Sequence, residues 1–379
     1  ICTTFKRNME TILLILFIAF LVFFAIQFIY QSFVFSRFSF VKPKKDTPKS
    51  IPVSVIVCAK NEYENLQKNL PILVAQNYPN YELVLIDDAS SDDTLELFEE
   101  YEKQYSFIKL VKVKNNEAFW GNKKFALTLG IKAAKNEYLL FTDADCCPNS
   151  ENWISEMTSH FSFKKTIVLG YGAYDKIKGS FLNKIIRYET VLTAIQYFSW
   201  AKVGKPYMGV GRNLAYKKSE FFNVNGFINH IRVRSGDDDL FINEAANASN
   251  TTICYNPEGF TYSKPKITYK EWFNQKRRHV STAKLYKGFD KFQLALYFIS
   301  QVLCITLAII LLSFQYNWII VTSVFGFRYI FNWIVFGYGA AKLNEKDVIV
   351  WYPIFEIILI ITQIRVAFTN LIFKPVHWK

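Results

Sequence analysis

The stretch from residue 11 to residue 30, TILLILFIAFLVFFAIQFIY, constrains the fold most, because it is mostly apolar and carries no charge. It has the length of about 20 residues that a helix needs to cross the hydrocarbon core of a bilayer. Three further candidate spans follow late in the chain, at about 294–314, 317–337 and 353–373. We therefore predict a multi-pass membrane protein with an N-terminal membrane anchor, residues 1–33, and a C-terminal transmembrane region, residues 291–379.

The last two of these spans each contain an arginine, Arg328 in one and Arg365 in the other. A charge in the middle of a span costs at least about 2.5 kcal/mol unless it reaches the interface or finds a partner. Glu356 is a candidate partner for either arginine. Two arrangements stay open for residues 353–373: a full span, or a helix that lies in the interface or dips in and out of the membrane.

Residues 34–290 form a polar block between the two apolar ends. The chain is 51% hydrophobic with a mean hydropathy of +0.09, which is too apolar for an ordinary soluble protein and too charged for a pure membrane bundle. Basic residues follow the first span directly, whereas the link at 315–317 is uncharged, so the positive-inside rule places the polar block in the cytoplasm. These basic residues are Arg37, Lys42, Lys44, Lys45 and Lys49.

The remaining composition narrows the classes of partner. The net charge of +13 is spread along the chain, and a basic cluster beside a span is more typical of contact with anionic lipid than with nucleic acid. The six cysteines lack the spacing of a zinc site. We expect membrane lipids as partners and no nucleic acid, and the oligomeric state stays open. A start at Met9 would remove Lys6 and Arg7 and make the orientation clearer.

Strand and helix signals alternate in the polar block. Short apolar and β-branched runs predict strands at 53–59, 81–87, 107–113 and 137–141. Helices are predicted from about residue 65, from residue 92 or 93, and over 122–134. This alternation predicts an α/β fold with a mostly parallel sheet covered on both faces.

Carboxylates gather where two of these strands end. Asp87 and Asp88 follow the second strand, and Asp143 and Asp145 follow the fourth. In such sheets ligands bind beyond the carboxyl ends of the strands. An Asp-x-Asp pair there can hold Mg²⁺ or Mn²⁺ and leave positions for phosphate oxygens. The alternative for this pair alone is a solvated turn with helix caps.

The order of the segments AKNE, DDASSDDT, GNKKFAL and TDAD resembles the family 2 glycosyltransferases, which are inverting sugar transferases with a glycosyltransferase-A fold. The resemblance covers most of residues 51–290 and implies a nucleotide-sugar donor, specifically a UDP-sugar. It also implies that Asp143 and Asp145 hold the metal. The implied donor contacts are the backbone near Ala59 and Glu62, the Asp87 and Asp88 pair at the uracil and ribose, Lys123 near the base, and Asp143.

A second acidic cluster, in VRSGDDDLFINEA, comprises Asp237, Asp238 and Asp239. Inverting transfer needs a base that takes the proton of the acceptor hydroxyl as it attacks the anomeric carbon, and a carboxylate suits this role. By the family's E-D-x-D-L pattern Asp237 matches the base, with Gly236 in place of the usual glutamate, and Asp238 is its rival. The alternative is a solvated helix N-terminus.

In WFNQKRRHVSTAK, three residues match the Gln-x-x-Arg-Trp motif of membrane-integrated members: Gln275, Arg278 and His279, with histidine in place of tryptophan. The resemblance implies that Gln275 and Arg278 bind the donor and that His279 contacts the acceptor. Arg212 is a second predicted acceptor contact. This segment also fits a basic amphipathic helix on lipid headgroups, and both descriptions can hold together. Residues 180–200 have helical spacing that fits either the bilayer surface or a packed core.

Together these features predict a membrane-bound inverting glycosyltransferase whose catalytic domain, residues 34–290, faces the cytoplasm and uses Mg²⁺ or Mn²⁺. The acceptor is a lipid or a growing polysaccharide, and the sequence does not choose between them. A function of another class stays open: a transporter or scaffold with a non-catalytic nucleotide-binding domain. Arg328 and Arg365 motivate that alternative.

Overall fold

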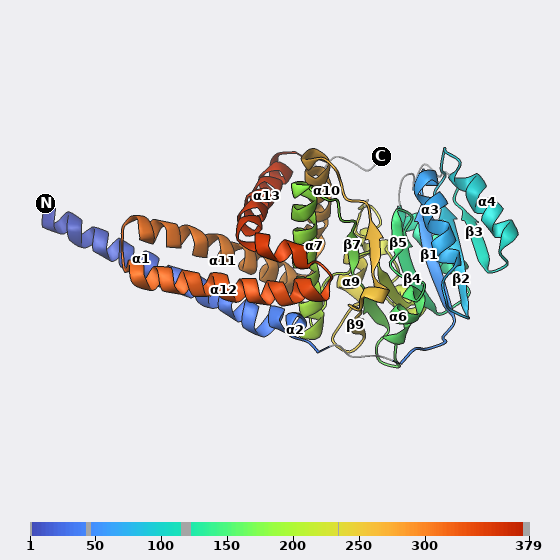
Figure 1. Cartoon of the computed structure of the whole chain (residues 1–379), viewed down its shortest axis with the longest axis horizontal. Coiled ribbons are helices and arrows are strands. Elements are labelled where there is room, and N and C mark those ends of the chain that lie inside the picture. Colours follow the sequence, from blue (N-terminus) through green and yellow to red (C-terminus); the bar gives the residue numbers. More distant parts are fainter. Residues whose placement is uncertain (1, 43–46, 115–122, 234, 374–379) are drawn as a thin grey trace.

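The computed structural model describes residues 2–42, 47–114, 123–233 and 235–373. Figure 1 shows an elongated molecule in which three long helices project from one end and a mixed α/β domain forms the other. Some residues singled out in the sequence lie outside the described ranges: Lys44 and Lys45 of the basic cluster, and Gly121 and Asn122 beside the lysine motif.

A seven-stranded sheet forms the centre of the domain, in the order β3-β2-β1-β4-β8-β6-β9. Four of its six neighbouring strand pairs are parallel, and β8 is antiparallel to both β4 and β6. The prediction of a mostly parallel sheet is therefore confirmed. The strands are β1 (Val53–Ala59), β2 (Tyr81–Asp87), β3 (Ile108–Lys112), β4 (Tyr138–Asp143), β6 (Ile167–Leu169), β8 (Leu214–Lys217) and β9 (Thr251–Ile253).

Successive side chains of a strand point to opposite faces of a sheet. Both faces of this sheet carry apolar side chains, and helices bury them. In β1, Val55 and Val57 belong to one core cluster, and Ile56 belongs to another on the opposite face. Gly130 allows a close approach of helix to sheet, since a Cβ there would lie 2.1 Å from Cδ1 of Ile86. The predicted helices are confirmed, with a further one after β4: α3 (Tyr63–Val74), α4 (Thr94–Gln104), α5 (Lys123–Ala133) and α6 (Trp153–Ser159).

A smaller three-stranded sheet, in the order β5-β10-β7, lies beside the main sheet. In it β10 pairs antiparallel with β5 and parallel with β7. The sequence analysis did not predict these short strands. The remaining elements of the domain are β5 (Cys146–Pro148), β7 (Gly172–Tyr174), β10 (Thr261–Ser263), α8 (Lys218–Asn223), α9 (Asp239–Ala245), and the short helices η2 (Ile228–His230), η3 (Pro257–Gly259) and η4 (Ala283–Leu285).

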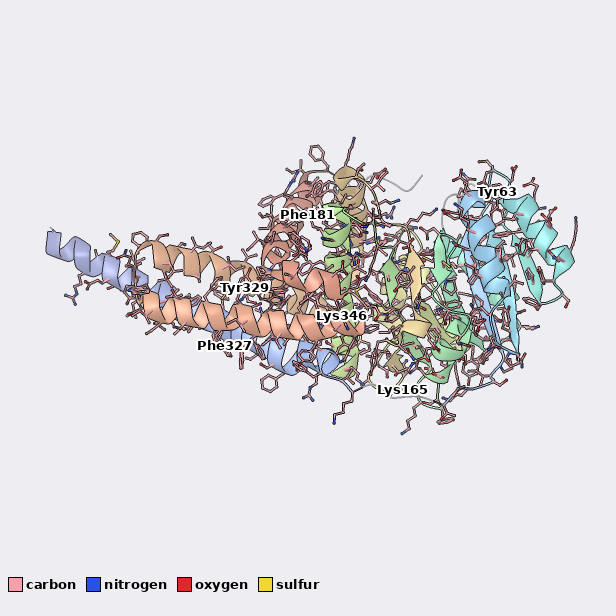
Figure 2. The ribbon with its side chains drawn as sticks, in the orientation of Figure 1. Tyr63, Lys165, Phe181, Phe327, Tyr329 and Lys346 are labelled. Carbon is pink, nitrogen blue, oxygen red and sulfur yellow. The ribbon has the colours of Figure 1, made fainter. Side chains whose placement is uncertain are left out.

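In the described part of the chain, four helices are long and apolar enough to cross a membrane, as predicted. Three of them, α1 (Cys2–Ile29), α11 (Gly288–Ser313) and α12 (Trp318–Lys342), form the projecting bundle in Figure 1, and α1 continues through η1 (Tyr30–Phe35) and α2 (Ser36–Ser39). A small apolar core that includes Phe20 and Leu311 joins them. Phe327 lies on the outer surface of the bundle, 51% exposed (Figure 2). Exposed apolar side chains of this kind suit a lipid environment.

The fourth of these helices, α13 (Tyr352–Ile372), follows the short helix η5 (Lys346–Trp351) and is arranged differently. It packs mainly against α7 (Phe181–Lys202) and α10 (Tyr269–Thr282), and in Figure 1 it runs at a steep angle to α12. Figure 2 places Phe181, Tyr329 and Lys346 where these helices meet the bundle. Buried residues are spread along the whole of α7, 13 of its 22 residues, so the packed-core alternative describes residues 180–200.

The two arginines in the apolar helices have different surroundings. Arg328 is buried and donates from Nη2 to Oε1 of Glu356 at 2.7 Å, and Gln301 donates to the same oxygen at 2.8 Å. Arg365 is exposed and lies over the rings of Tyr269 and Phe273 at 5.7 and 5.5 Å. Glu356 therefore partners Arg328, and the pair joins α12 to α13.

Candidate functional site

The carboxyl ends of β2, β1 and β4 bring the first acidic residues to one edge of the sheet. In the strand register Ala59 lies beside Asp87, and Cys58 lies beside Asp143. Neighbouring strands are about 4.8 Å apart, so Asp87 and Asp143 lie about 10 Å from each other, across one intervening strand. The register thus places Asp87 and Asp143 at one edge of the sheet, as predicted.

Lys123, the first residue of α5, links the two acidic clusters. Its Nζ lies 2.7 Å from Oδ1 of Asp143 and 3.0 Å from Oδ2 of Asp237. Burial by itself lowers the pKa of Lys123, but the two carboxylates outweigh it and raise this pKa well above its usual value. Burial likewise would raise the pKa of Asp237, and the Lys123 ammonium lowers it instead. Lys123 and Asp237, 114 positions apart along the chain, thus share with Asp143 one charged pocket, whose lining also includes the apolar side chains of Ile56 and Phe141.

Asp145 lies next to Asp143 and suits a hard divalent cation. One carboxylate oxygen of each residue and Sγ of Cys146 lie within 4.8 Å of one another. Two oxygen ligands of one Mg²⁺ are at most about 4.2 Å apart, twice a metal–oxygen distance of about 2.1 Å, so small side-chain rotations bring the two aspartates into range. A thiol is a poor ligand for such a cation. The donor set that fits Mg²⁺ or Mn²⁺ here is therefore the Asp143 and Asp145 pair.

The three aspartates at the start of α9, of which Asp239 is its first residue, have different partners. Asp237 faces Lys123, as above, while Asp238 accepts from the backbone N–H of Gly211 at 2.6 Å and of Asp239 at 2.8 Å. Asp239 points away, toward the end of α10, and accepts from Thr282 at 2.5 Å and Tyr286 at 2.7 Å. Burial, reinforced by Asp237 and Asp239, raises the pKa of Asp238 to about 7.

Gly236 enters this turn with φ +84°, in the left-handed region that favours glycine. A Cβ at this position would also lie 2.6 Å from Cδ1 of Leu240. A glutamate at position 236, which is the residue that the family pattern places there, would therefore be strained in this backbone conformation.

The residues predicted near the nucleoside lie at the ends of β1 and β2. The carbonyl of Ala59 accepts from the backbone N–H of Asp88 at 2.8 Å. The carboxylate of Asp87 is buried and accepts from the N–H of Ser90. Glu62 is held by Asn65, whose Nδ2 donates to Oε2 of Glu62 at 2.7 Å. These contacts shape two adjoining loops, one after β1 and one after β2.

Helix α10 brings Gln275 to Tyr174 at the end of β7. Nε2 of Gln275 donates to the Tyr174 hydroxyl at 3.3 Å, and the guanidinium of Arg212 lies 4.3 Å from the centre of the same ring. Arg278 is partly buried, and burial lowers its pKa, opposed by Tyr174 and Asp237. His279, the predicted acceptor contact that replaces tryptophan, is exposed. Its acceptor role stays a prediction.

The contacts of Arg212 are with protein groups. Besides the Tyr174 ring, its Nη1 donates to the carbonyl of Ala173 at 3.1 Å and to Oγ of Ser263 at 2.9 Å. The side chain thus braces β8 against the smaller sheet. Its predicted contact with the acceptor also stays a prediction.

Sequence reasoning missed two residues beside the site. Tyr174 stands in no recognisable motif, and no signal along the chain links it to Gln275. Lys124 is the second lysine of GNKKFAL, and the sequence pattern assigns it no role. It is fully buried and donates to the His230 and Val233 carbonyls at 2.8 and 3.0 Å and to Nδ1 of His230 at 2.7 Å. It therefore tethers the segment that leads into the Asp237 turn. The sequence signal for Lys124 is that it follows Lys123 directly, as the second lysine of a pair in an otherwise amphipathic helix.

In the comparison with protein families, the model described as "Glycosyl transferase family 2" matches residues 54–234. Among curated proteins, the chain is 31% identical over 167 residues to the poly-beta-1,6-N-acetyl-D-glucosamine synthase of Staphylococcus epidermidis, covering 43% of this chain and 38% of that protein. It is 36% identical over 101 residues to the cholesterol galactosyltransferase of Borreliella burgdorferi, covering 27% of each. The matched stretches thus span well under half of these relatives.

Among solved structures, the chain is similar to a mannosyltransferase from Pyrobaculum calidifontis in complex with GDP-Man and Mn²⁺. The TM-score is 0.58 at 15% identity, and the match covers 91% of this chain and 98% of that one. At this identity the likeness shows the fold, the glycosyltransferase-A arrangement, and it extends over the apolar helices as well as the domain.

Proposed function

This chain belongs to glycosyltransferase family 2 through its residues 54–234, and from that premise we propose that it is a membrane-bound inverting transferase. It moves a sugar from a nucleotide-sugar, which we propose to be a UDP-sugar, to a lipid or a growing polysaccharide. The observation that carries the proposal is the pocket in which Lys123 joins Asp143 to Asp237. A nucleotide-binding scaffold has no use for a carboxylate pair at a metal position beside a second acidic cluster at a base position.

The donor lies, in this proposal, along the sheet edge. The nucleoside contacts the loops of Ala59, Glu62, Asp87 and Asp88, and the diphosphate reaches Asp143 through the cation. Asp143 and Asp145 would hold Mg²⁺ or Mn²⁺, which when bound neutralises charge on the diphosphate. Lys123 and Arg278 supply fixed positive charge to the same leaving group, and Arg278 can donate two parallel hydrogen bonds to it.

Between the two candidate bases, the geometry favours Asp238. The Lys123 ammonium stabilises the ionised form of Asp237, which makes it a weak proton acceptor, whereas Asp238 has a pKa of about 7. Because a side chain at position 236 would be strained, the acidic pair of the family pattern fits Asp237 and Asp238 better than positions 236 and 237. Asp238 takes the proton of the acceptor hydroxyl, whose oxygen bonds to the anomeric carbon as the bond to the nucleoside diphosphate breaks.

This assignment predicts how transfer depends on pH. The base acts in its ionised form, and its raised pKa means that it gains a proton as the pH falls through about 7. The transfer rate, kcat/KM, should therefore fall about tenfold per pH unit below that value and level off above it. An acid limb that appears only below the ordinary carboxyl range would point to Asp237, whose pKa is lowered.

The membrane arrangement in the proposal puts the domain in the cytoplasm. Basic residues border the domain-side ends of the bundle helices, whereas the turn at 314–317 on the far side is uncharged, and the far end of α1 carries Lys6, Arg7 and Glu10. Packing of α13 on α7 and α10 supports its lying in the interface rather than spanning the bilayer. The proposal divides the chain into a membrane anchor at residues 1–33, a catalytic domain at 34–290 and a C-terminal membrane region at 291–379. The bordering basic residues are Arg37, Lys284, Lys287, Lys291, Lys342 and Lys346.

The two arginines in the apolar helices, which motivated a transporter, have another explanation. Arg328 is paired with Glu356, and Arg365 stacks on aromatic rings.

The relatives include one enzyme named for a lipid acceptor and one named for a polymer, so both acceptor classes stay in the proposal. Membranes that contain the protein should be incubated with a panel of labelled nucleotide-sugars. Label that enters organic solvent indicates a lipid acceptor, and label in a precipitable polymer indicates a polysaccharide. Transfer from no donor in the panel would contradict the proposal.

A further inference from the structure

Helix α10, which carries Gln275 and Arg278, is held from several sides. Successive residues of an α-helix point about 100° apart, so neighbours in sequence meet different elements. Gln275 faces Tyr174 of the domain, Lys276 pairs with Glu189 of α7, and Arg277 faces α13. The position of the two predicted donor residues therefore depends on contacts made by the residues between them.

The contact with α13 is reciprocal. Nε of Arg277 donates to Oδ1 of Asn370 at 2.9 Å, and Nδ2 of Asn370 donates back to the carbonyl of Arg277 at 3.0 Å. Nη2 of Arg277 donates to the carbonyl of Phe373 at 2.9 Å. Arg277 is only 7% exposed. A planar guanidinium in such a site fixes direction as well as distance, which a lysine does not.

Helix α13 is itself fixed to the bundle. Glu356, near its start, is hydrogen-bonded to Arg328 of α12 and to Gln301 of α11, and all three side chains are buried. A buried ion pair of this kind holds its two helices in one arrangement, since separating the charges leaves each one unpaired in an apolar surrounding. Polar contacts thus fix α13 to the membrane bundle near its start, at Glu356, and to α10 near its end, at Asn370.

We propose that Arg277 and Asn370 are positioning residues for the transferase site: by fixing α10 to α13 they place Gln275 and Arg278 against the donor diphosphate. Helix α13 is then a working part of the donor site as well as a membrane helix. The inference rests on the proposed function, because it assigns Gln275 and Arg278 to the donor. It predicts that a residue on the last turns of α13 affects donor binding without touching the donor.

The test is a double-mutant cycle between Asn370→Ala and Arg278→Ala in the full-length protein in lipid nanodiscs. The readouts are the Kd of UDP and of GDP with Mn²⁺, by calorimetry, and KM and kcat for the donor that is transferred. Asn370→Ala alone should weaken nucleotide binding and raise the donor KM about tenfold, with a smaller change in kcat. In the Arg278→Ala background the same change should alter Kd and KM by only about twofold, because coupled residues do not act additively and only the Gln275 contact remains to be displaced.

Two further variants sharpen the test. Asn370→Asp keeps the acceptor for the Arg277 guanidinium and should restore most of the affinity. Thr369→Ala is the matched control on the same turn, since the Thr369 hydroxyl donates to the Arg365 carbonyl within its own helix, and it should bind nucleotide like the unchanged protein.

Equal losses for Asn370→Ala in both backgrounds would show a general structural effect and overturn the positioning role while leaving the proposed function intact. Unaltered affinity in Asn370→Ala would overturn it as well. If the unchanged protein binds neither nucleotide and transfers no sugar, the proposed function fails, and the positioning role fails with it.

Discussion

Replacing Asp238 with asparagine should lower sugar transfer by about 10²–10⁴-fold, the range that a positioned general base contributes. An amide cannot take the proton of the acceptor hydroxyl, but its oxygen can still accept from the backbone N–H of Gly211 or of Asp239. The turn should therefore keep its shape, and the protein should remain folded and inserted. Transfer of labelled sugar by membranes, at matched amounts of protein, measures the effect.

The comparison variant is Asp237→Asn, which removes a partner of Lys123 and leaves Asp238 in place. Its loss should be smaller, and its acid limb should move to lower pH, because the charge of Asp237 helps to raise the pKa of Asp238. In Asp238→Asn any residual activity should lose the acid limb. A larger loss in Asp237→Asn, with transfer retained in Asp238→Asn, would return the base to Asp237.

Replacing Asp143 with asparagine should reduce transfer by about 10²–10³-fold, the size of effect found when one electrostatic contact to the developing charge is removed. It should also weaken Mn²⁺ binding, because the pair with Asp145 loses one of its two carboxylates. The paramagnetic resonance signal of free Mn²⁺ measures binding directly, independent of turnover. A chelator should stop transfer by the unchanged protein, and added Mn²⁺ or Mg²⁺ should restore it.

The control for Asp143→Asn is Asp93→Asn, an exposed aspartate before α4 whose side chain makes no capping hydrogen bond. It removes the same charge from the same domain outside the pocket, so it should alter neither Mn²⁺ binding nor transfer. Transfer that persists in the presence of chelator, or equal Mn²⁺ affinity in Asp143→Asn and the unchanged protein, would remove the metal from the proposal.

Strands and spans were predictable because their signals are local. The run from Val53 to Ala59 is bounded by Pro52 and a polar turn, and the structure gives a strand with those limits. The uncharged stretch at 11–30 could be recognised as a membrane span from its length alone. The short strands β5, β7 and β10 carry three residues each and no periodic pattern, so nothing in the sequence marked them.

The candidate site was predictable in part. That Asp87 and Asp143 share an edge follows from parallel strands, and the register of β1 with β2 and β4 bears it out. Which of Asp237 and Asp238 faces Lys123 depends on the backbone conformation of the turn that contains Gly236, and the order of residue types does not show that conformation. The sequence offered Glu356 as a partner for either Arg328 or Arg365. Helix packing pairs it with Arg328.

By itself the sequence determined the parts: apolar helices, an α/β domain, and acidic residues at strand ends, because each rests on residues close together in the chain. Only the tertiary structure decided how the parts act on one another. The tie from Arg277 to Asn370, 93 residues apart, and the bridge from Lys123 to two carboxylates join segments that no periodicity relates. Hydrogen bonds and ion pairs act over a few ångströms in space, so they exist only after the chain has folded.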